Sequence, residues 1–225
     1  MEYKHIEEAV FLRRPNRFLA AVSLNGREET VHVKNTGRLK ELFIPGARVL
    51  LDHSEAAGRK TEYDLVSVYL GDTLVNVDSQ APNRIAEEYL RKSCPGLTEL
   101  RPETVSGGSR FDFYGVNGGQ PFYLEIKGVT LVRNGIAFFP DAPTDRGLKH
   151  IRELTVLKRS GINAGVLFII QRDDVQAFSP NRETQPAFAD ALAEAKAAGV
   201  FIGAVNCSVM PGRVRVKEKV NVILT

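Results

Sequence analysis

The chain has 225 residues, of which 43% are hydrophobic, and it carries a formal net charge of +3. This length suits two small domains, and the apolar content excludes a disordered protein. Two widely separated cysteines, Cys94 and Cys207, without a Cys-x-x-Cys motif, argue against a zinc site and against a disulfide framework. The late apolar run at residues 166–170 is too short to span a bilayer, and no apolar signal region begins the sequence. We therefore expect a cytoplasmic protein.

The charge differs between the two parts of the chain. Residues 1–78 hold 11 Lys and Arg against 12 Asp and Glu, whereas the remainder holds 19 against 15. Electrostatic attraction to phosphate groups is therefore expected mainly in the second part.

Residues 1–78 are predicted to form a β domain. Short runs rich in Val, Leu and Tyr occur at residues 17–24, 29–34, 47–53 and 63–78. Asn25-Gly26 is a strong hairpin signal between the first two runs. Roughly five strands in this length fit a small OB-like β-barrel.

One loop of this domain gathers polar and basic side chains. His32, Lys34, Asn35 and Arg38 cluster around a predicted strand end and the turn Asn35-Thr36-Gly37. We expect this loop to face nucleic acid or the second domain. Asn and Gly also suit turns for geometric reasons alone, so a structural role stays open.

Residues 79–225 are predicted to form an α/β (α+β) domain with a mixed sheet. A helix is expected over residues 79–92, capped by Asp78 or Ser79. It is followed by strands at residues 99–105, 109–114 and 122–131. A helix from Thr144 or Asp145 to about Ser160, a strand at 163–172, a helix at 185–198 and strands at 200–205 and 213–224 complete the order.

The strand Phe122 to Gly128 carries the strongest chemical signal. Its period of two places Glu125 and Lys127 on one face. Asp112, on the preceding strand, can lie beside Glu125 across a hairpin. Two neighbouring carboxylates repel unless a cation joins them, and Mg²⁺ or Mn²⁺ suits such a site, with the backbone oxygen of Ile126 as a further ligand. The pattern predicts a metal-dependent nuclease-type core in which Lys127 stabilises charge on a phosphoryl group.

An alternative is a surface salt-bridge ladder of Asp112, Glu125, Lys127 and Arg110. The upstream helix favours a site instead, because it offers Glu87 or Glu88 as a third carboxylate. Helical phase does not choose between these two, and Glu103 is another candidate.

The helix after Thr144 favours the same interpretation, because Arg146, Lys149 and His150 cluster on one side of its first turns and are plausible phosphate contacts. Near the end of the chain, Arg213, Arg215, Lys217 and Lys219 give a strand one basic face. That face either touches nucleic acid or keeps an edge strand soluble, and we favour the second role.

Several sequence blocks together resemble one known family, the sugar fermentation stimulation proteins (SfsA), over nearly the whole chain. The blocks are Arg17-Phe18-Leu19-Ala20, Asn35-Thr36-Gly37, Asn83-Arg84, Arg110-Phe111-Asp112-Phe113, Glu125 to Leu131, Phe139-Pro140-Asp141-Ala142, and Thr144 to Leu154.

The resemblance implies an OB-like domain followed by a PD-(D/E)xK nuclease-like domain, with Asp112, Glu125 and Lys127 as the nuclease triad. It favours Glu88 as the carboxylate of the helix. A Phe stands at position 111 where the motif has Pro, which leaves the carboxylate of Asp112 in place. The family implies a non-specific DNA binder linked to maltose use. A non-catalytic regulatory protein therefore stays open beside a Mg²⁺-dependent nuclease acting on nucleic acid, with DNA favoured over RNA.

Overall fold

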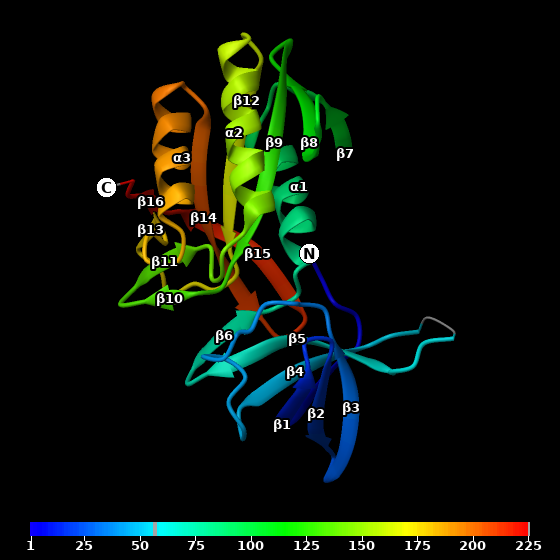
Figure 1. Cartoon of the computed structure of the whole chain (residues 1–225). Helices are drawn as coiled ribbons and strands as arrows, with labels where there is room; N and C mark the ends of the chain where they lie inside the picture. The colour runs from blue at the N-terminus through cyan, green and yellow to red at the C-terminus, as the bar shows by residue number, and fades with distance from the viewer. Residues whose placement is uncertain (56–57, 225) are drawn as a thin grey trace.

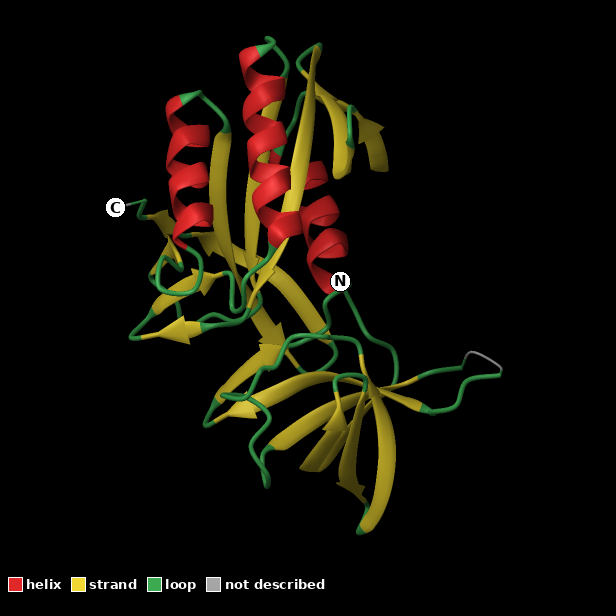
Figure 2. Cartoon of the chain, viewed as in Figure 1, coloured by secondary structure: helices red, strands yellow, loops and turns green. Residues whose placement is uncertain are grey.

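The structure, a computed structural model, describes residues 1–55 and 58–224, and its first part is an all-β barrel (Figures 1 and 2). Six strands follow in order: β1 (Ile6–Asn16), β2 (Leu19–Leu24), β3 (Arg27–Val33), β4 (Arg48–His53), β5 (Tyr63–Leu70) and β6 (Thr73–Asn76). The sheet order β3-β2-β1-β4-β5-β6 closes through a parallel pairing of β3 with β5. The expected OB-like barrel is confirmed.

The hairpin signal in this barrel is also confirmed. Asn25 and Gly26 connect β2 to β3 with φ values of 52° and 79°, the left-handed conformation that a tight two-residue hairpin requires. The sequence prediction missed β1, because its charged residues and Pro15 interrupt the alternation. Only Ala9 and Phe11 of this strand are buried in the barrel core.

The second part is a mixed sheet with helices on both faces. Its elements are α1 (Ala81–Ser93), β7 (Leu97–Ser106), β8 (Ser109–Asn117), β9 (Gln120–Val129), β10 (Val132–Arg133), β11 (Ile136–Phe139), α2 (Asp145–Arg159), β12 (Asn163–Ile170), β13 (Ala177–Pro180), α3 (Pro186–Ala197), β14 (Phe201–Met210), β15 (Arg213–Lys219) and β16 (Asn221–Val222). The main sheet has the order β15-β14-β12-β9-β8-β7, with β9, β12 and β14 parallel and the outer strands antiparallel. The predicted mixed-sheet α/β domain is confirmed.

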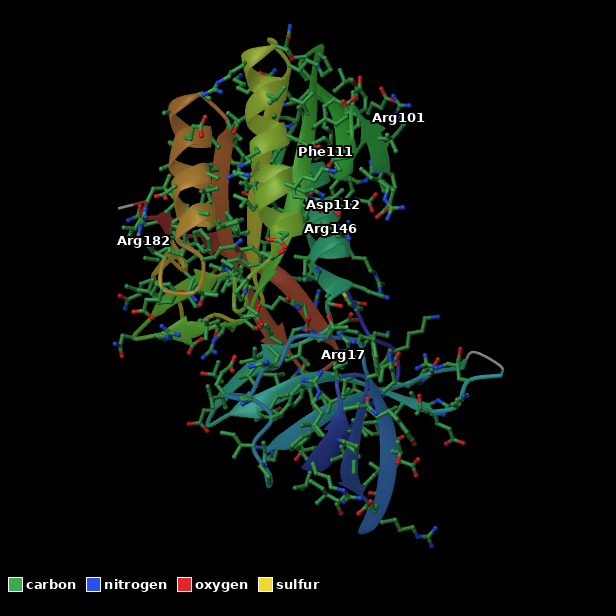
Figure 3. All side chains as sticks on the ribbon, viewed as in Figure 1. Arg17, Arg101, Phe111, Asp112, Arg146 and Arg182 are labelled. Atoms are coloured by element: carbon green, nitrogen blue, oxygen red, sulfur yellow. The ribbon has the colours of Figure 1, made fainter. Side chains whose placement is uncertain are left out.

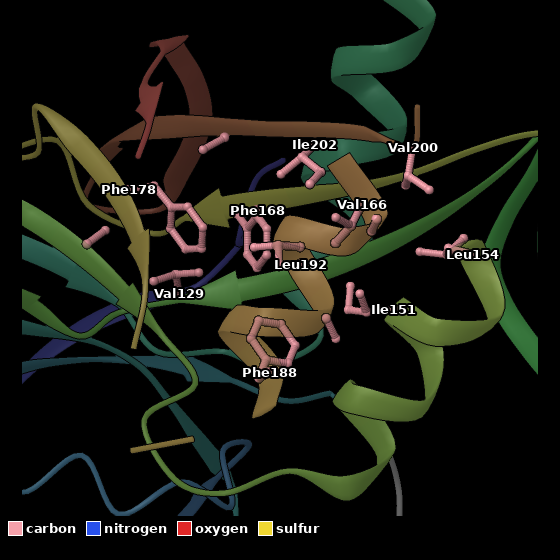
Figure 4. Packing of buried hydrophobic residues seen from close by; sticks show 14 of the residues in the cluster. Val129, Ile151, Leu154, Val166, Phe168, Phe178, Phe188, Leu192, Val200 and Ile202 are labelled. Carbon is pink, nitrogen blue, oxygen red and sulfur yellow. The ribbon is translucent and has the colours of Figure 1, made fainter. Parts of the chain in front are cut away.

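Each face of this sheet is covered by its own hydrophobic layer. On one face, Ile151 of α2 and Phe188 of α3 pack with Val166 and Phe168 of β12 (Figure 4). On the other face, Ile85 of α1 packs with strand residues such as Leu124 and Leu167. Alternate residues of the central strands therefore serve different layers, and the face that bears Glu125 is the one that α2 covers.

Helix caps explain where two helices begin and end. The Thr144 hydroxyl accepts the N–H of Gly147 at 3.0 Å and caps α2, as predicted. Gly199, with φ of 87°, follows α3 as expected. The expected side-chain cap of α1 is wrong: its cap residue is Gln80, without a side-chain hydrogen bond, while Asp78 accepts the N–H of Gln80 just before the helix.

The two parts meet through buried polar contacts. Gln171 at the end of β12 donates to Asn76 Oδ1 at 2.6 Å and to the carbonyl of Asp78 at 3.0 Å. The first residues of the chain also pack on the second part, because Tyr3 N–H donates to the Gly212 carbonyl at 2.8 Å. Residues 1–5 thus precede the barrel strands and bridge to β15. Among the described residues, no helix is long and apolar enough to cross a membrane.

Candidate functional site

The candidate site lies where β8 separates from β9. Their antiparallel pairing ends at Phe113 and Leu124, whereas β8 stays paired with β7 as far as Ser109. Asp112 fills the break in the ladder: its Oδ2 accepts the N–H of Ile126 at 2.7 Å. The carbonyl of Ile126 points to the same edge of β9, because the N–H and C=O of one residue in an extended strand share a side. Figure 3 labels Asp112 on β8 and Arg146 at the start of α2.

Helix α1 fixes the second oxygen of Asp112. The Asn83 amide nitrogen donates to Asp112 Oδ1 at 2.9 Å, so each carboxylate oxygen of Asp112 has one hydrogen-bond donor. Asn83 occupies the first turn of α1, which packs on the opposite face of the sheet from α2. The carboxylate is therefore held between a helix and a strand before any ligand arrives.

Glu125 is the most deeply buried member of the site. Its side chain is 3% exposed, and its Oε1 accepts hydrogen bonds from Lys127 Nζ and from His150 Nδ1 on α2. An ionised carboxylate only accepts, so Nδ1 of His150 carries the proton in this pair. The other oxygen, Oε2, is buried and has no hydrogen-bond partner within the described residues. An unpartnered buried carboxylate oxygen is costly and indicates a place for a cation or water.

The two carboxylates have opposite pKa shifts. Burial raises the pKa of Asp112, and the nearby charge of Glu125 raises it further, against the donors Ile126 and Asn83. Burial also acts to raise the pKa of Glu125, but the hydrogen bond from His150 and the charge of Lys127 outweigh it, so this pKa is lowered. The pair thus holds an ionised Glu125 beside an Asp112 whose charge is disfavoured without a cation.

These donors fit a hard divalent cation. No group of three His, Cys, Asp or Glu side chains that could hold a metal occurs in residues 1–55 and 58–224. Mg²⁺ does not require one, since it is commonly bound by one or two carboxylates with water and phosphate completing its shell. Asp112, the unpartnered oxygen of Glu125 and the carbonyl of Ile126 are the groups that could provide such a donor set.

The carboxylates predicted as a third ligand each have another partner in the structure. Glu88 accepts the Met1 amino group at 2.7 Å, between α1 and β15, and so it is not brought to Asp112. Glu87 pairs with Arg91 on the surface of α1, and Glu103 pairs with Arg110 at 2.8 Å. Helical phase alone did not identify Asn83 as the α1 residue that meets Asp112.

The basic residues predicted to contact phosphate fall into two groups. Arg110, Arg146 and Lys149 are exposed, and Lys149 Nζ donates to the Gly108 carbonyl at 3.0 Å. His150 differs from the expectation, because it is buried and bound to Glu125 rather than displayed with its neighbours. The helix period places residue 150 toward the sheet, where Ile151 and Leu154 also pack.

The barrel loop at residues 35–38 faces the second domain. It lines an interdomain cavity of about 450 Å³ together with residues 128–131, 138–139 and 141–144. The Asn35 side chain serves the turn itself, since it accepts the Gly37 N–H at 2.8 Å and donates to the Val77 carbonyl at 2.9 Å. Lys34 pairs at 2.7 Å with the buried carboxylate of Asp64, whereas Arg38 is exposed.

Arg14 organises this loop and was not identified from the sequence. Its guanidinium donates to the carbonyls of Arg17, Asn35, Gly37 and Arg38 at 2.6 to 3.0 Å. Its position in a charged strand, among other arginines, gave no sign of this role. The Asn35-Thr36-Gly37 block is thus held in place by a half-buried residue of β1.

Comparisons with known proteins agree over the whole chain. Residues 12–77 match the SfsA N-terminal OB domain, and residues 80–213 match the sugar fermentation stimulation protein RE domain. The sugar fermentation stimulation protein homolog of Desulfitobacterium hafniense (strain DSM 10664 / DCB-2) is 46% identical over 100% of this chain and 99% of its own length. That of Clostridium botulinum (strain Alaska E43 / Type E3) is 47% identical over 98% and 97%.

A solved structure gives the same result. The structure of Pyrococcus furiosus SfsA in complex with Ca²⁺ superposes with a TM-score of 0.89 at 31% identity, covering 99% of this chain and 98% of that one. Both domains and nearly the full length are shared with these relatives. The chain therefore belongs to the sugar fermentation stimulation protein family.

Proposed function

We propose that this protein is a divalent-metal-dependent phosphodiesterase that acts on nucleic acid, with Asp112, Glu125 and the Ile126 carbonyl as metal ligands and Lys127 beside them. The observation that carries the proposal is the buried, unpartnered Oε2 of Glu125 near the half-buried carboxylate of Asp112. A surface salt-bridge ladder would leave these groups exposed, whereas Glu125 is 3% exposed.

The known complex of a relative supports the choice of ion. Pyrococcus furiosus SfsA has been solved with Ca²⁺, which takes oxygen ligands. Mg²⁺ and Mn²⁺ share that preference and are the proposed cofactors here. When bound, such an ion polarises a phosphoryl oxygen and lowers the pKa of a coordinated water.

The side chains around the carboxylates have separate roles in this proposal. His150 holds Glu125 in position and keeps its charge through a buried hydrogen bond. Lys127, whose side chain is 14% exposed, places a positive charge beside Glu125, where it can stabilise negative charge growing on the phosphoryl oxygens. Hydrolysis forms a bond from water oxygen to phosphorus and breaks the bond to the leaving sugar oxygen, which takes up a proton.

The substrate is proposed to approach along exposed cations. Arg146 and Lys149 lie on the first turns of α2, the helix that brings His150 to Glu125. Arg38 lines the interdomain cavity. Such cations hold phosphates without reading the base sequence. The OB-like barrel adds a fold that often carries single strands.

Cleavage assays test this proposal directly. Single-stranded, duplex and branched DNA and RNA are incubated with the protein in Mg²⁺, in Mn²⁺ and in chelator. We expect metal-dependent cleavage that Glu125→Gln abolishes and that the surface control Glu194→Gln, on α3, retains. Binding without cleavage in any metal would instead favour the non-catalytic regulatory role, and cleavage that persists in Glu125→Gln would exclude this site.

A further inference from the structure

A wide cavity lies on the α1 face of the main sheet, opposite the face that bears Glu125. It has a volume of about 880 Å³, a size typical of small-molecule sites, and opens over the start of β9, β12 and β14, beside α1. From this cavity we propose a second binding site whose ligand is a nucleotide, either free or as one unit of a nucleic-acid strand.

Two phenylalanine rings form the floor of the cavity. Phe201 lies over Gly203 so closely that a Cβ built on the glycine would come within 2.6 Å of the ring, and Gly165 lies beneath the same side chain. Phe122 covers Gly115 in the same way, at 2.4 Å. The missing side chains let both rings lie against the sheet, and Phe201 remains 59% exposed. A flat ring with one free face is a stacking platform for a base.

Polar side chains line the same cavity. Asn117, Gln120 and Asn221 are exposed and line it. Primary amides offer both donors and acceptors, which is the combination that reads the edge of a base. A purely hydrocarbon ligand would have no use for them.

Positive charge adjoins this cavity where it meets α1 and β15. A neighbouring cavity of about 370 Å³ shares Tyr89, Ser93 and Lys219 with the first, so the two lie side by side. It lies between α1 and β15 and is lined by the cations Lys92, Arg215, Lys217 and Lys219.

Carboxylates offset part of this positive charge. Arg215 pairs with Glu2 at 3.6 Å and Lys217 pairs with Asp173 at 3.8 Å. Two further carboxylates line the cavity itself: Glu88, which is bound to the Met1 amino group, and Glu218, which accepts the Asn206 amide at 3.4 Å. Neither Lys92 nor Lys219 has an ion-pair partner among the described residues, so a phosphate can be held here.

The arrangement matches both the base and the phosphate of a nucleotide. An apolar, aromatic floor with amides at its edge takes the base, and adjoining lysines take the phosphate. This also gives the basic face of β15 a role besides keeping an edge strand soluble. The site is separate from Asp112 and Glu125, so it does not depend on cleavage there.

Calorimetric titration in chelator tests the proposal with four probes: AMP, adenosine, inorganic phosphate and a single-stranded oligo(dA). We expect AMP or the oligonucleotide to bind at least about tenfold more tightly than adenosine or phosphate. Phe201→Ser should weaken that binding about 5- to 150-fold, the range of one base stack. Lys92→Gln with Lys219→Gln should weaken it and reduce its salt dependence.

The controls separate this site from the cleavage site. Val156→Ser removes an equally exposed apolar side chain from α2, and it should bind as the wild type does, as should Glu125→Gln. Binding of AMP alone identifies a free nucleotide, and binding of the oligonucleotide alone identifies a strand. The proposal would be overturned if neither AMP nor the oligonucleotide bound at millimolar concentration. It would also be overturned if Phe201→Ser and the double lysine variant both bound as tightly as the wild type. Neither result would bear on the cleavage site.

Discussion

His150 on α2 and Glu125 on β9 form a buried hydrogen bond that joins the helix to the strand carrying the candidate site. Both side chains are at most 5% exposed, and Lys127 shares the same carboxylate oxygen. The contact sets both the position of Glu125 and its protonation state. It gives His150 a positioning role rather than contact with a phosphate.

Replacing His150 with Ala should destabilise the protein. The change removes one donor from a buried charged oxygen, and we expect a loss of about 1 to 3 kcal/mol in the free energy of unfolding. Urea titration measures it, with His5→Ala at an exposed position as the control. A loss no larger than that of His5→Ala would show that the buried pair contributes nothing.

Asp112→Asn should stabilise the metal-free protein, or leave it equally stable, at neutral pH. The pKa of Asp112 is raised by burial and by Glu125, so its contribution is favourable below its unfolded pKa and is lost as pH rises through the folded value. The difference in unfolding free energy between Asp112→Asn and wild type should therefore shift in favour of the variant above about pH 4. Asp72→Asn, at an exposed position, is the control and should show no such shift between variant and wild type. If Asp112 is merely a surface carboxylate, Asp112→Asn should show no shift either.

The core of this site could be predicted from the sequence, but its surroundings could not. A period of two correctly paired Glu125 with Lys127 on one face of a strand. It could not show that β8 leaves β9 at Asp112, because Phe111 and Phe113, two residues apart, pack in different layers of the core. Such a departure depends on pairing with two different neighbours and not on the local pattern.

Long-range contacts also decided which polar residues reach the site. Glu87, Glu88 and Asn83 all lie on α1, and the helix sequence alone does not indicate that the amide of Asn83 contacts Asp112. In the barrel, the mixed charges of β1 hid its alternation, although Asn25-Gly26 located the next hairpin. The short strands β11 and β13 were missed because they pair with each other across a long stretch of sequence.

Acid should weaken the barrel through Asp64. Burial would raise the pKa of this carboxyl, but hydrogen bonds from Arg59, Lys34 and His32 lower it to about 2. Its contribution is present above the unfolded pKa near 4 and is lost as pH falls from about 4 to about 2. Asp64→Asn should cost on the order of 2 kcal/mol at pH 6 and progressively less in that window. A cost that is independent of pH would contradict this role.

Replacing Lys34 should mainly affect stability, whereas replacing Arg38 should mainly affect oligonucleotide binding. Lys34→Ala breaks a pair with a buried carboxylate, so we expect it to lower the melting temperature. Arg38→Ala, at an exposed position of the interdomain cavity, should leave stability within about 0.5 kcal/mol of wild type. It should also weaken oligonucleotide binding and reduce the slope of log affinity against log salt. Unchanged binding and slope in Arg38→Ala would return this loop to a purely structural role.

The most direct test of the proposed site is the calorimetric titration of Mn²⁺ into wild type, Glu125→Gln and Lys127→Ala. If Glu125 and Asp112 bind the ion, wild type and Lys127→Ala should bind Mn²⁺, and Glu125→Gln should bind it at least about tenfold more weakly, as loss of a charged ligand predicts. Equal binding by wild type and Glu125→Gln, or no binding by either, would contradict a metal-dependent site at these residues.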